Sequence, residues 1–254
     1  MESEAHRISD PRMENLAFIQ HNPDGTVSTY NCTWVREEGP TEAGRAASRY
    51  LQTCFNDPTQ VNQFFTPDKL RCHRLARQVR TAPFIARRFV RSAPTMLHVN
   101  RHTRKHVVSG GVPDRIVDVL CRERLGYGHD DIQRELMLNG GFVALEVPLY
   151  SPQLTGHLDC LICPQEIDTL FALEVKSYPS DFTDPWAGTG KWRLYKNLVQ
   201  ALGYAELLAH NTGLTQIATG IVHTDGVFIF DAADWLRQER TLLAGIRSYL
   251  SRTA

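Results

Sequence analysis

The sequence of 254 residues lacks several features that would place it in a specialised class of protein. It has no apolar run near the roughly 20 residues that cross a bilayer, and its first ten residues are polar, without the apolar segment of a secretory signal. Its six cysteines are too sparse for a disulfide scaffold. These absences predict an intracellular protein, cytoplasmic or nuclear, that has no membrane partner.

The sequence also lacks a net charge, because 28 Lys and Arg residues balance 28 Asp and Glu residues. The charge is nevertheless segregated, since residues 69–107 contain eleven basic residues and no Asp or Glu. A basic segment of this kind is typical of proteins that bind polyanions, because each Lys or Arg that neutralises a phosphate releases counterions. We therefore predict nucleic-acid contact. The alternative is a solvated helical face that pairs with acids elsewhere in the fold.

The candidate nucleic-acid-binding residues form two groups. Six lie in the basic segment: Arg74, Arg77, Arg80, Arg87, Arg88 and Arg91. Three lie where a later predicted helix begins, interleaved with Trp and Tyr: Lys191, Arg193 and Lys196. Bases stack on aromatic rings while phosphates pair with cations, which suits a nucleic-acid strand. For the second group the alternative is the start of an amphipathic helix with Trp192 in the core.

Periodicity and turn residues divide the chain near residue 112. The first part, 1–112, predicts a hairpin at 15–35 and helical segments at 46–56 and 67–92. Pro83 and Pro94 interrupt or end the basic helical part. The second part, 113–254, predicts helices at 113–126, 129–139, 192–209 and 232–251, and strands at 142–150, 156–163, 170–178, 216–223 and 227–230. We expect an α/β (α+β) fold, in which helices flank a mixed central sheet, preceded by a mainly helical basic region that binds substrate.

Asp159, Glu174 and Lys176 carry the strongest chemical signal. Side chains alternate along a strand, so Glu174 and Lys176 project to the same face. If the two strands pair as a hairpin, Asp159 lies beside Glu174. Paired carboxylates suit Mg²⁺ or Mn²⁺, with the backbone carbonyl of Val175 as a further candidate ligand. The cation would activate water, and Lys176 would orient that water or stabilise developing charge. The alternative is a buried salt-bridge trio without catalysis.

These residues belong to a pattern that resembles a known nuclease superfamily. The pattern consists of Gly156-x-x-Asp159, Glu174-x-Lys176 and Gln200-x-x-x-Tyr204. It is similar to the PD-(D/E)xK nucleases, specifically the RecB-like branch with lambda-type exonucleases and CRISPR-adaptation nucleases, over about residues 113–235. The resemblance implies a restriction-endonuclease-like core, with Asp159 and Glu174 as metal ligands and Lys176 as a catalytic residue. It also implies that Gln200 and Tyr204 contact DNA or steady the site.

The resemblance further implies an acidic or His residue on the helix before the first strand of this core. We choose His129 as that metal ligand, ahead of Asp130, Glu135 and Glu123. Glu146 resembles a recurrent strand acid and is a candidate supporting group. Some relatives carry an iron–sulfur cluster on cysteines that lie mostly near the C-terminus. Because no Cys follows Cys163, we expect no iron–sulfur cluster here.

The sequence therefore predicts a divalent-metal-dependent nuclease that hydrolyses phosphodiester bonds, with DNA exonuclease activity favoured. Two alternatives stay open. One is an RNA-directed endonuclease, and the other is a catalytically inactive nucleic-acid-binding protein on the same fold. The expected partner in each case is nucleic acid, with DNA favoured over RNA.

Overall fold

The computed structural model describes residues 12–37, 39–101, 105–108, 110–122, 128–139, 141–178, 188–238 and 242–253. Within these ranges, only the backbone is described for 105–108, 188–192, 247 and 249–253. None of the helices described there is both long enough and apolar enough to span a bilayer.

Ten strands of the described chain form one sheet in the order β1-β2-β6-β7-β8-β9-β10-β4-β5, with the short β3 beside β7. Their bounds are β1 Met13–His21, β2 Val27–Val35, β3 Leu70–Arg71, β4 Thr95–Asn100, β5 Lys105–Val108, β6 Phe142–Tyr150, β7 Leu154–Cys163, β8 Leu170–Lys176, β9 Ile217–His223 and β10 Gly226–Asp231. The pairs β8–β9 and β3–β7 are parallel, and the others are antiparallel. The sheet is therefore mostly antiparallel.

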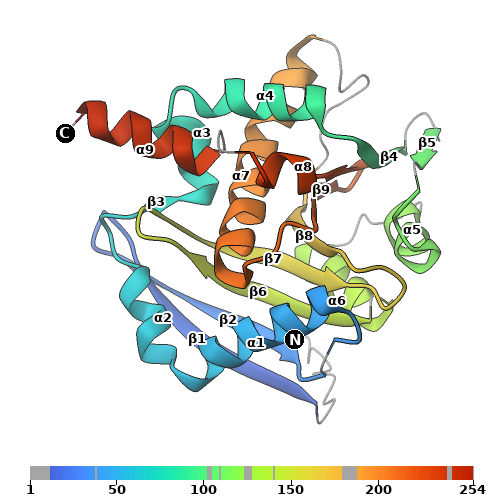
Figure 1. The fold of residues 1–254 in the computed structure, drawn as a ribbon, viewed down its shortest axis with the longest axis horizontal. Coiled ribbons are helices and arrows are strands. Elements are labelled where there is room, and N and C mark those ends of the chain that lie inside the picture. The colour runs from blue at the N-terminus through green and yellow to red at the C-terminus, as the bar shows by residue number, and fades with distance from the viewer. Residues whose placement is uncertain are drawn as a thin grey trace, which may run out of the picture.

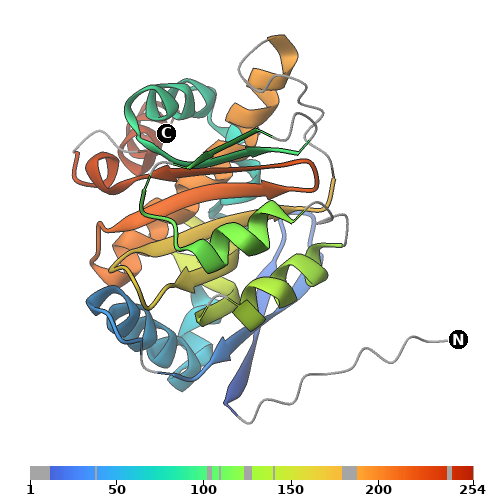
Figure 2. The same ribbon diagram turned by 90° about the vertical axis from the view of Figure 1, so that its right-hand side faces the viewer.

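Helices cover both faces of this sheet (Figures 1 and 2). Their bounds are α1 Glu42–Asn56, α2 Pro58–Phe64, the 3-10 turn η1 Cys72–Arg74, α3 Leu75–Gln78, α4 Ala82–Ser92, α5 Asp114–Cys121, α6 His129–Asn139, α7 Gly188–Thr212, α8 Ala233–Leu236 and α9 Leu242–Thr253. One core lies between the sheet and α7, and a second core lies between the sheet and the pair α5 and α6. This arrangement confirms the predicted sheet flanked by helices.

The strand β8 shows why both faces of the sheet are apolar. Leu170 and Ala172 point into the core beneath α7, whereas Phe171, Leu173 and Val175 point into the core beneath α5 and α6. A strand that is buried on both faces reads as a nearly continuous apolar run. Charged residues in such a run stand out, and β8 ends with two of them, Glu174 and Lys176. Their strand alternation places both on the face that α7 covers.

The alternation of β6 changes at Glu146. Phe142 and Ala144 face α7 before this residue, and Val147 and Leu149 face α7 after it, so the parity of the strand switches. Glu146 has a φ of 51°, which is left-handed backbone. A non-glycine residue adopts this conformation at a cost, and such residues cluster at functional sites. The left-handed backbone at Glu146 therefore interrupts the alternation of β6 and changes the direction of the Glu146 side chain.

The segment 67–92, which was predicted to be helical with an interruption at Pro83, also contains a short strand. The segment contains β3, η1, α3 and α4 in succession. The strand β3 pairs with β7, and the buried Arg71 within it donates to Thr155 Oγ1 at 2.6 Å and to the carbonyls of His21 and Thr66, each at 2.8 Å. These three hydrogen bonds offset much of the cost of burying the guanidinium, although Arg71 Nε is buried without a partner among the described residues. Arg71 therefore serves the fold, and this tertiary contact interrupts the helix.

The predicted division near residue 112 does not correspond to two separate sheets. Strands β1 and β2 extend one side of the sheet and β4 and β5 the other, with the strands of 113–254 between them. Figure 1 shows the blue N-terminal hairpin and the green β4 on opposite sides of the yellow strands. The assignment of 1–112 as a substrate-binding region stays a prediction.

Candidate functional site

A pocket of about 390 Å³ lies where β8 ends, between η1, α6 and α7. It brings together residues from six elements and from the segment after β8: Tyr30, His73, His129, His157, Asp159, Glu174, Val175, Lys176, Ser177, Tyr178 and Gln200. Every residue predicted to bind metal lines this pocket, as do Lys176 and Gln200. The sequence positions are far apart, so the sheet and its flanking helices assemble the site.

Glu174 and Lys176 form a closely bonded pair in the pocket. Lys176 Nζ donates to Glu174 Oε1 and, at 3.2 Å, to Gln200 Oε1. Glu174 is only 1% exposed, and its burial together with the nearby Asp159 raises its pKa well above the usual range. Burial opposes the charge on Lys176, but Glu174 outweighs it, and the pKa of Lys176 is raised. The ammonium group is therefore charged and held by two acceptors.

Ten buried side-chain nitrogen and oxygen atoms of the described residues have no hydrogen-bond partner, and the second oxygen of Glu174 is the one carboxylate oxygen among them. Glu174 Oε2 is buried and accepts no hydrogen bond from any described residue. A buried carboxylate oxygen without a partner carries a desolvation penalty of about 1–3 kcal/mol, and more when charged. Native proteins seldom leave such an atom unsatisfied, and a bound cation is one way in which a protein satisfies it.

Asp159 lies beside Glu174, as the predicted strand pairing requires. Strands β7 and β8 are antiparallel, so the pairing Cys160↔Leu173 brings Asp159, which precedes Cys160, beside Glu174, which follows Leu173. Val175 N–H also donates to Asp159 Oδ2 at 2.7 Å. The Val175 side chain packs into the opposite core. The Val175 backbone thus lies next to the Asp159 carboxylate. The role of the Val175 carbonyl as a metal ligand stays a prediction.

His129 begins α6 and points at the same carboxylate. Its Nε2 lies 3.3 Å from Asp159 Oδ2, and this contact raises the pKa of His129 despite its burial. Asp130, the neighbouring alternative, is 95% exposed and lies 3.6 Å from His129 Nδ1 on the other side of the ring. Glu135 pairs with Arg122 at 2.6 Å, and Glu123 falls outside the described residues. Of the described alternatives on this segment, His129 is the one that lines the pocket.

Glu146 was absent from the predicted ligand set, although its carboxylate joins the cluster. One ligand atom from each of His129, Glu146 and Asp159 lies within 4.8 Å of the others, so these three could hold a metal ion. Gln133 Nε2 fixes this arrangement by donating to Glu146 Oε1 at 3.1 Å and to the Asp159 carbonyl at 2.8 Å. Burial and the charge of Asp159 raise the pKa of Glu146 to about 7. The sequence signal that could have identified Glu146 as a ligand is that it is a charged residue within an apolar strand.

Gln200 and Tyr204 form a support beneath Lys176. Gln200 Nε2 donates to Tyr204 OH at 3.0 Å, while its Oε1 accepts from Lys176. Tyr204 is fully buried, and a Cβ added to Gly156 would lie 2.5 Å from its ring atom Cε1. The glycine is thus required by the close approach of the tyrosine ring. Of the two predicted roles, steadying the site fits a buried tyrosine, and direct contact with a nucleic acid does not.

Five pocket residues had no predicted role: Tyr30, His73, His157, Ser177 and Tyr178. The rings of Tyr30 and His157 stack with their centroids 3.9 Å apart, and His73 lies on η1. Burial lowers the pKa of His157 to about 4, so this imidazole is neutral near pH 7. His157 lies inside the motif that contains Gly156 and Asp159, which was the only sequence signal for it.

The predicted nucleic-acid-binding residues lie outside the pocket lining. Arg77, Arg80, Arg88, Arg91, Arg193 and Lys196 are exposed, and Arg74 and Arg87 are half-buried. The Lys191 side chain falls outside the described part of the chain. Not every cation of the basic segment is available for a partner, because Arg101 donates to the carbonyls of His223 at 2.6 Å and Leu120 at 2.5 Å.

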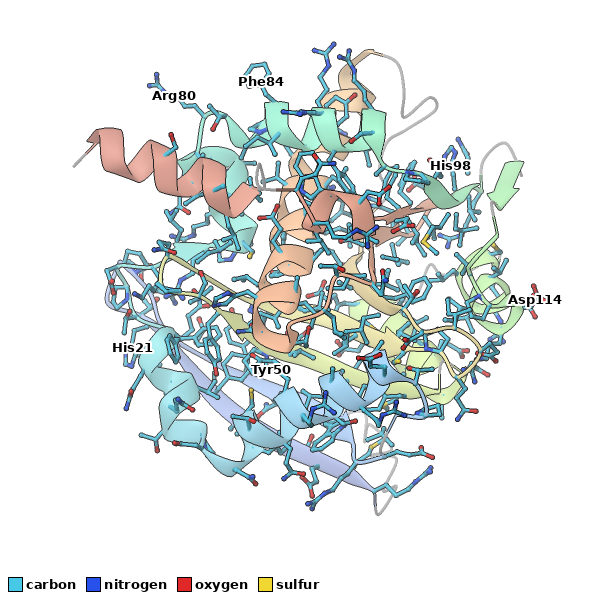
Figure 3. The ribbon with its side chains drawn as sticks, in the orientation of Figure 1. His21, Tyr50, Arg80, Phe84, His98 and Asp114 are labelled. Atoms are coloured by element: carbon cyan, nitrogen blue, oxygen red, sulfur yellow. The ribbon has the colours of Figure 1, made fainter. Side chains whose placement is uncertain are left out.

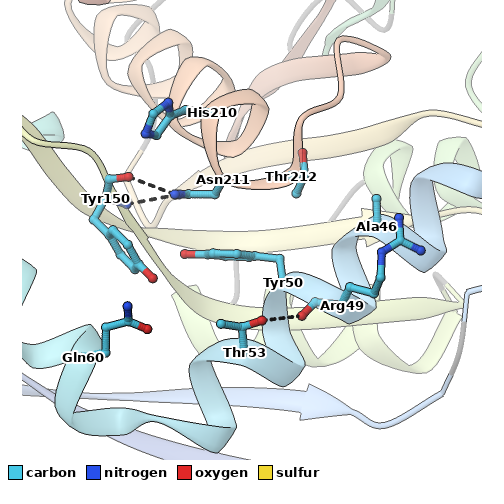
Figure 4. A pocket seen from close by; sticks show the side chains of 9 residues that line it. All are labelled: Ala46, Arg49, Tyr50, Thr53, Gln60, Tyr150, His210, Asn211 and Thr212. Atoms are coloured by element: carbon cyan, nitrogen blue, oxygen red, sulfur yellow. Dashed lines mark hydrogen bonds between the residues drawn. The ribbon is translucent and has the colours of Figure 1, made fainter.

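A second pocket of about 380 Å³ lies between α1, α2 and the end of α7 (Figure 4). No carboxylate is among the side chains that line it, which are Ala46, Arg49, Tyr50, Thr53, Gln60, Tyr150, His210, Asn211 and Thr212. Asn211 is committed to the backbone of Tyr150, accepting at 3.2 Å and donating at 2.9 Å. The Tyr50 hydroxyl donates to the Pro148 carbonyl at 2.6 Å. These polar groups hold the fold together and suggest no chemistry.

The six cysteines are free thiols, and Cys160 and Cys163 face opposite cores. Comparisons of the chain with models of protein families, with curated proteins and with solved structures give no match. The geometry of the pocket is therefore the basis for a functional proposal.

Proposed function

We propose that this protein is a divalent-metal-dependent nuclease of the PD-(D/E)xK type. The observation that carries the proposal is the meeting of Asp159 and Glu174 beside Lys176 in an open pocket, with Glu174 Oε2 buried and without a partner. A salt-bridge trio that served only the fold would be expected to pair both oxygens of its buried acid, since a buried polar atom without a partner is costly. A cation next to this oxygen supplies the missing partner.

The donor set fits Mg²⁺ or Mn²⁺. Asp159 and Glu174 offer carboxylate oxygens, which both ions accept, and His129 adds an imidazole nitrogen, which favours Mn²⁺ more than Mg²⁺. Cysteine thiolates, which would favour zinc or an iron–sulfur cluster, are not among the pocket residues. When bound, such an ion neutralises phosphodiester charge and lowers the pKa of coordinated water.

The remaining groups of the pocket position a charged donor. Glu174 and Gln200 both accept from Lys176 Nζ, so the ammonium group has a defined location next to the acids. Tyr204 in turn fixes Gln200. A preorganised cation of this kind stabilises the negative charge that develops on phosphorus oxygens during hydrolysis. Lys176 is the proposed catalytic residue, and Gln200 and Tyr204 are positioning residues.

The substrate that we propose is nucleic acid, and DNA is favoured by the resemblance of the motifs to RecB-like exonucleases. Exposed arginines on α3 and α4 supply a surface for phosphates, because nucleic-acid affinity depends largely on such contacts. RNA cleavage and binding without cleavage are the competing outcomes of the test.

The test measures cleavage of end-labelled single-stranded DNA, duplex DNA and single-stranded RNA with Mg²⁺, with Mn²⁺ and with chelator. We expect metal-dependent cleavage that falls by about 100-fold or more in Lys176→Met, since one lost donor to the developing charge costs about 10²–10³ in rate. Salt-dependent binding should persist in this variant. Asp159→Asn should also be inactive, whereas Asp130→Asn, which alters a carboxylate that is 95% exposed, should cleave normally.

Two results would overturn this proposal. Cleavage at the wild-type rate by Lys176→Met would remove the catalytic role of the lysine. Binding of all three substrates without cleavage under either metal would instead assign a nucleic-acid-binding protein that has no nuclease activity.

A further inference from the structure

The exposed face of α4 combines arginines with one large apolar side chain. Phe84, Arg88 and Arg91 follow one another at intervals of four and three residues, which places them on one side of the helix. Phe84 is 61% exposed. Arg80 precedes the helix, and Figure 3 shows Arg80 and Phe84 both projecting outward, away from the sheet. We call these four residues the α4 stripe.

The α4 stripe stands on a rigid support. The opposite side of the helix buries Ala82, Ala86 and Phe89. The Phe89 ring packs edge-to-face on Phe230 and Trp235, with centroids 5.8 and 5.5 Å apart. Because the buried side anchors the helix, the exposed side presents its groups with little loss of backbone entropy on binding.

The charges of the α4 stripe are not used within the described fold. Arginines that pair with acids among the described residues lie elsewhere: Arg12, Arg36, Arg115, Arg122, Arg134 and Arg237. The stripe also belongs to residues 69–107, which hold no acid in a chain that is neutral overall. Its cations are therefore uncompensated locally, which suits a polyanionic partner.

An exposed phenylalanine among arginines adds information about the polyanion. Aromatic rings on basic surfaces stack with the bases of single-stranded nucleic acids, and every base offers a face for this contact. In a duplex the bases are already stacked on each other, so only the phosphates would meet the stripe. We propose that the α4 stripe binds single-stranded nucleic acid, with an unpaired base stacked on Phe84 and phosphates paired with the flanking arginines.

This inference deepens the proposed function by naming a single strand as the substrate form. The helix that carries the stripe packs on α7, which also carries Gln200 of the pocket and the exposed Lys196. A strand held on α4 would therefore be bound on the same helical layer that supports the site. Binding is measured in the presence of chelator, so that it does not depend on cleavage.

The experiment compares Phe84→Ala with Leu138→Ala by fluorescence anisotropy on oligo(dT) and on a duplex of equal length. Leu138 is a matched control because it is 59% exposed and lies on α6. We expect Phe84→Ala to weaken single-strand binding by about 5- to 100-fold, the equivalent of one lost stacking contact. Duplex binding should be unchanged, Phe84→Trp should retain affinity, and Leu138→Ala should bind as the wild type does.

A second measurement tests the arginines. For single strands, the slope of log K against log salt falls by about 0.7 for each lost phosphate contact, so Arg88→Gln and Arg91→Gln should each lower it by that amount. The proposal is overturned if Phe84→Ala binds the single strand normally, if it weakens the duplex equally, or if the protein binds only anionic lipid vesicles or an acidic peptide. If the wild type is an active nuclease but Phe84→Ala binds single strands with unchanged affinity, the role of the α4 stripe is refuted while the proposed nuclease function stands.

Discussion

The substitution Gly156→Ala tests how the motif residues are packed beneath the site. A Cβ at this position would lie 2.5 Å from Tyr204 Cε1 and 3.1 Å from Cys72 Cβ, whereas ordinary contacts begin at 3.4 Å. The tyrosine ring would have to move by about 0.9 Å, and it is fully buried. Overpacking of a well-packed core costs about 1–3 kcal/mol. We expect Gly156→Ala to lower the free energy of unfolding by that amount.

The measurement is urea denaturation of the wild type and of matched variants. Gly110→Ala is the control, because no atom would lie within 4 Å of its added Cβ, and its stability should stay within about 0.5 kcal/mol of the wild type. In the background of Tyr204→Leu the cost of Gly156→Ala should shrink, with a coupling energy of about 0.5–3 kcal/mol. Equal costs in both backgrounds, or a Gly156→Ala variant as stable as Gly110→Ala, would refute the reasoning.

Two further predictions concern Glu206, which is buried, and Glu146, which is half-buried. Glu206 accepts from the backbone N–H groups of Leu242 and Leu243, each at 2.6 Å, and from the Trp235 indole at 3.1 Å, and burial raises its pKa from 4.5 to about 7. Since the folded state holds this proton more tightly than the unfolded state, the stability of the wild type relative to Glu206→Gln should fall by up to about 3 kcal/mol as pH rises from 4.5 to 7. Urea denaturation of both proteins across this pH range measures the difference, and a difference that does not change with pH would contradict the prediction. Glu146 has left-handed backbone, which glycine adopts more easily than alanine, so Glu146→Gly should be about 1 kcal/mol more stable than Glu146→Ala. Because both variants remove a candidate metal ligand, both should lose part of any rise in melting temperature that Mn²⁺ causes in the wild type.

Local patterns were sufficient for several elements around the site. The predicted helix at 129–139 and strand at 142–150 match α6 and β6, because a helical composition closed by a turn and a long apolar run are short-range signals. The pairing of Asp159 with Glu174 followed from two consecutive strands joined by a short turn. Where neighbouring segments interact, the sequence holds most of the necessary information.

Other features depended on contacts between distant segments. Strand β3 forms only because Leu70 and Arg71 meet β7, some 84 residues later in the chain. The predicted final helix at 232–251 is instead two described helices, α8 and α9, and the buried Glu206 accepts the first N–H groups of α9. A helix end that is capped by a remote carboxylate leaves no local signal of the kind that an adjacent Ser or Asp provides.

The sequence by itself determined the identity of the acids and the lysine, the segregation of basic charge into residues 69–107, and the order of most helices and strands. Only the tertiary structure decided that Glu146 joins His129 and Asp159, because a left-handed residue breaks the strict alternation that sequence reasoning assumes. It also decided that Tyr204 is a buried support. Local periodicity follows from backbone geometry, whereas the choice of face and neighbour follows from the packing free energy of segments far apart in the chain.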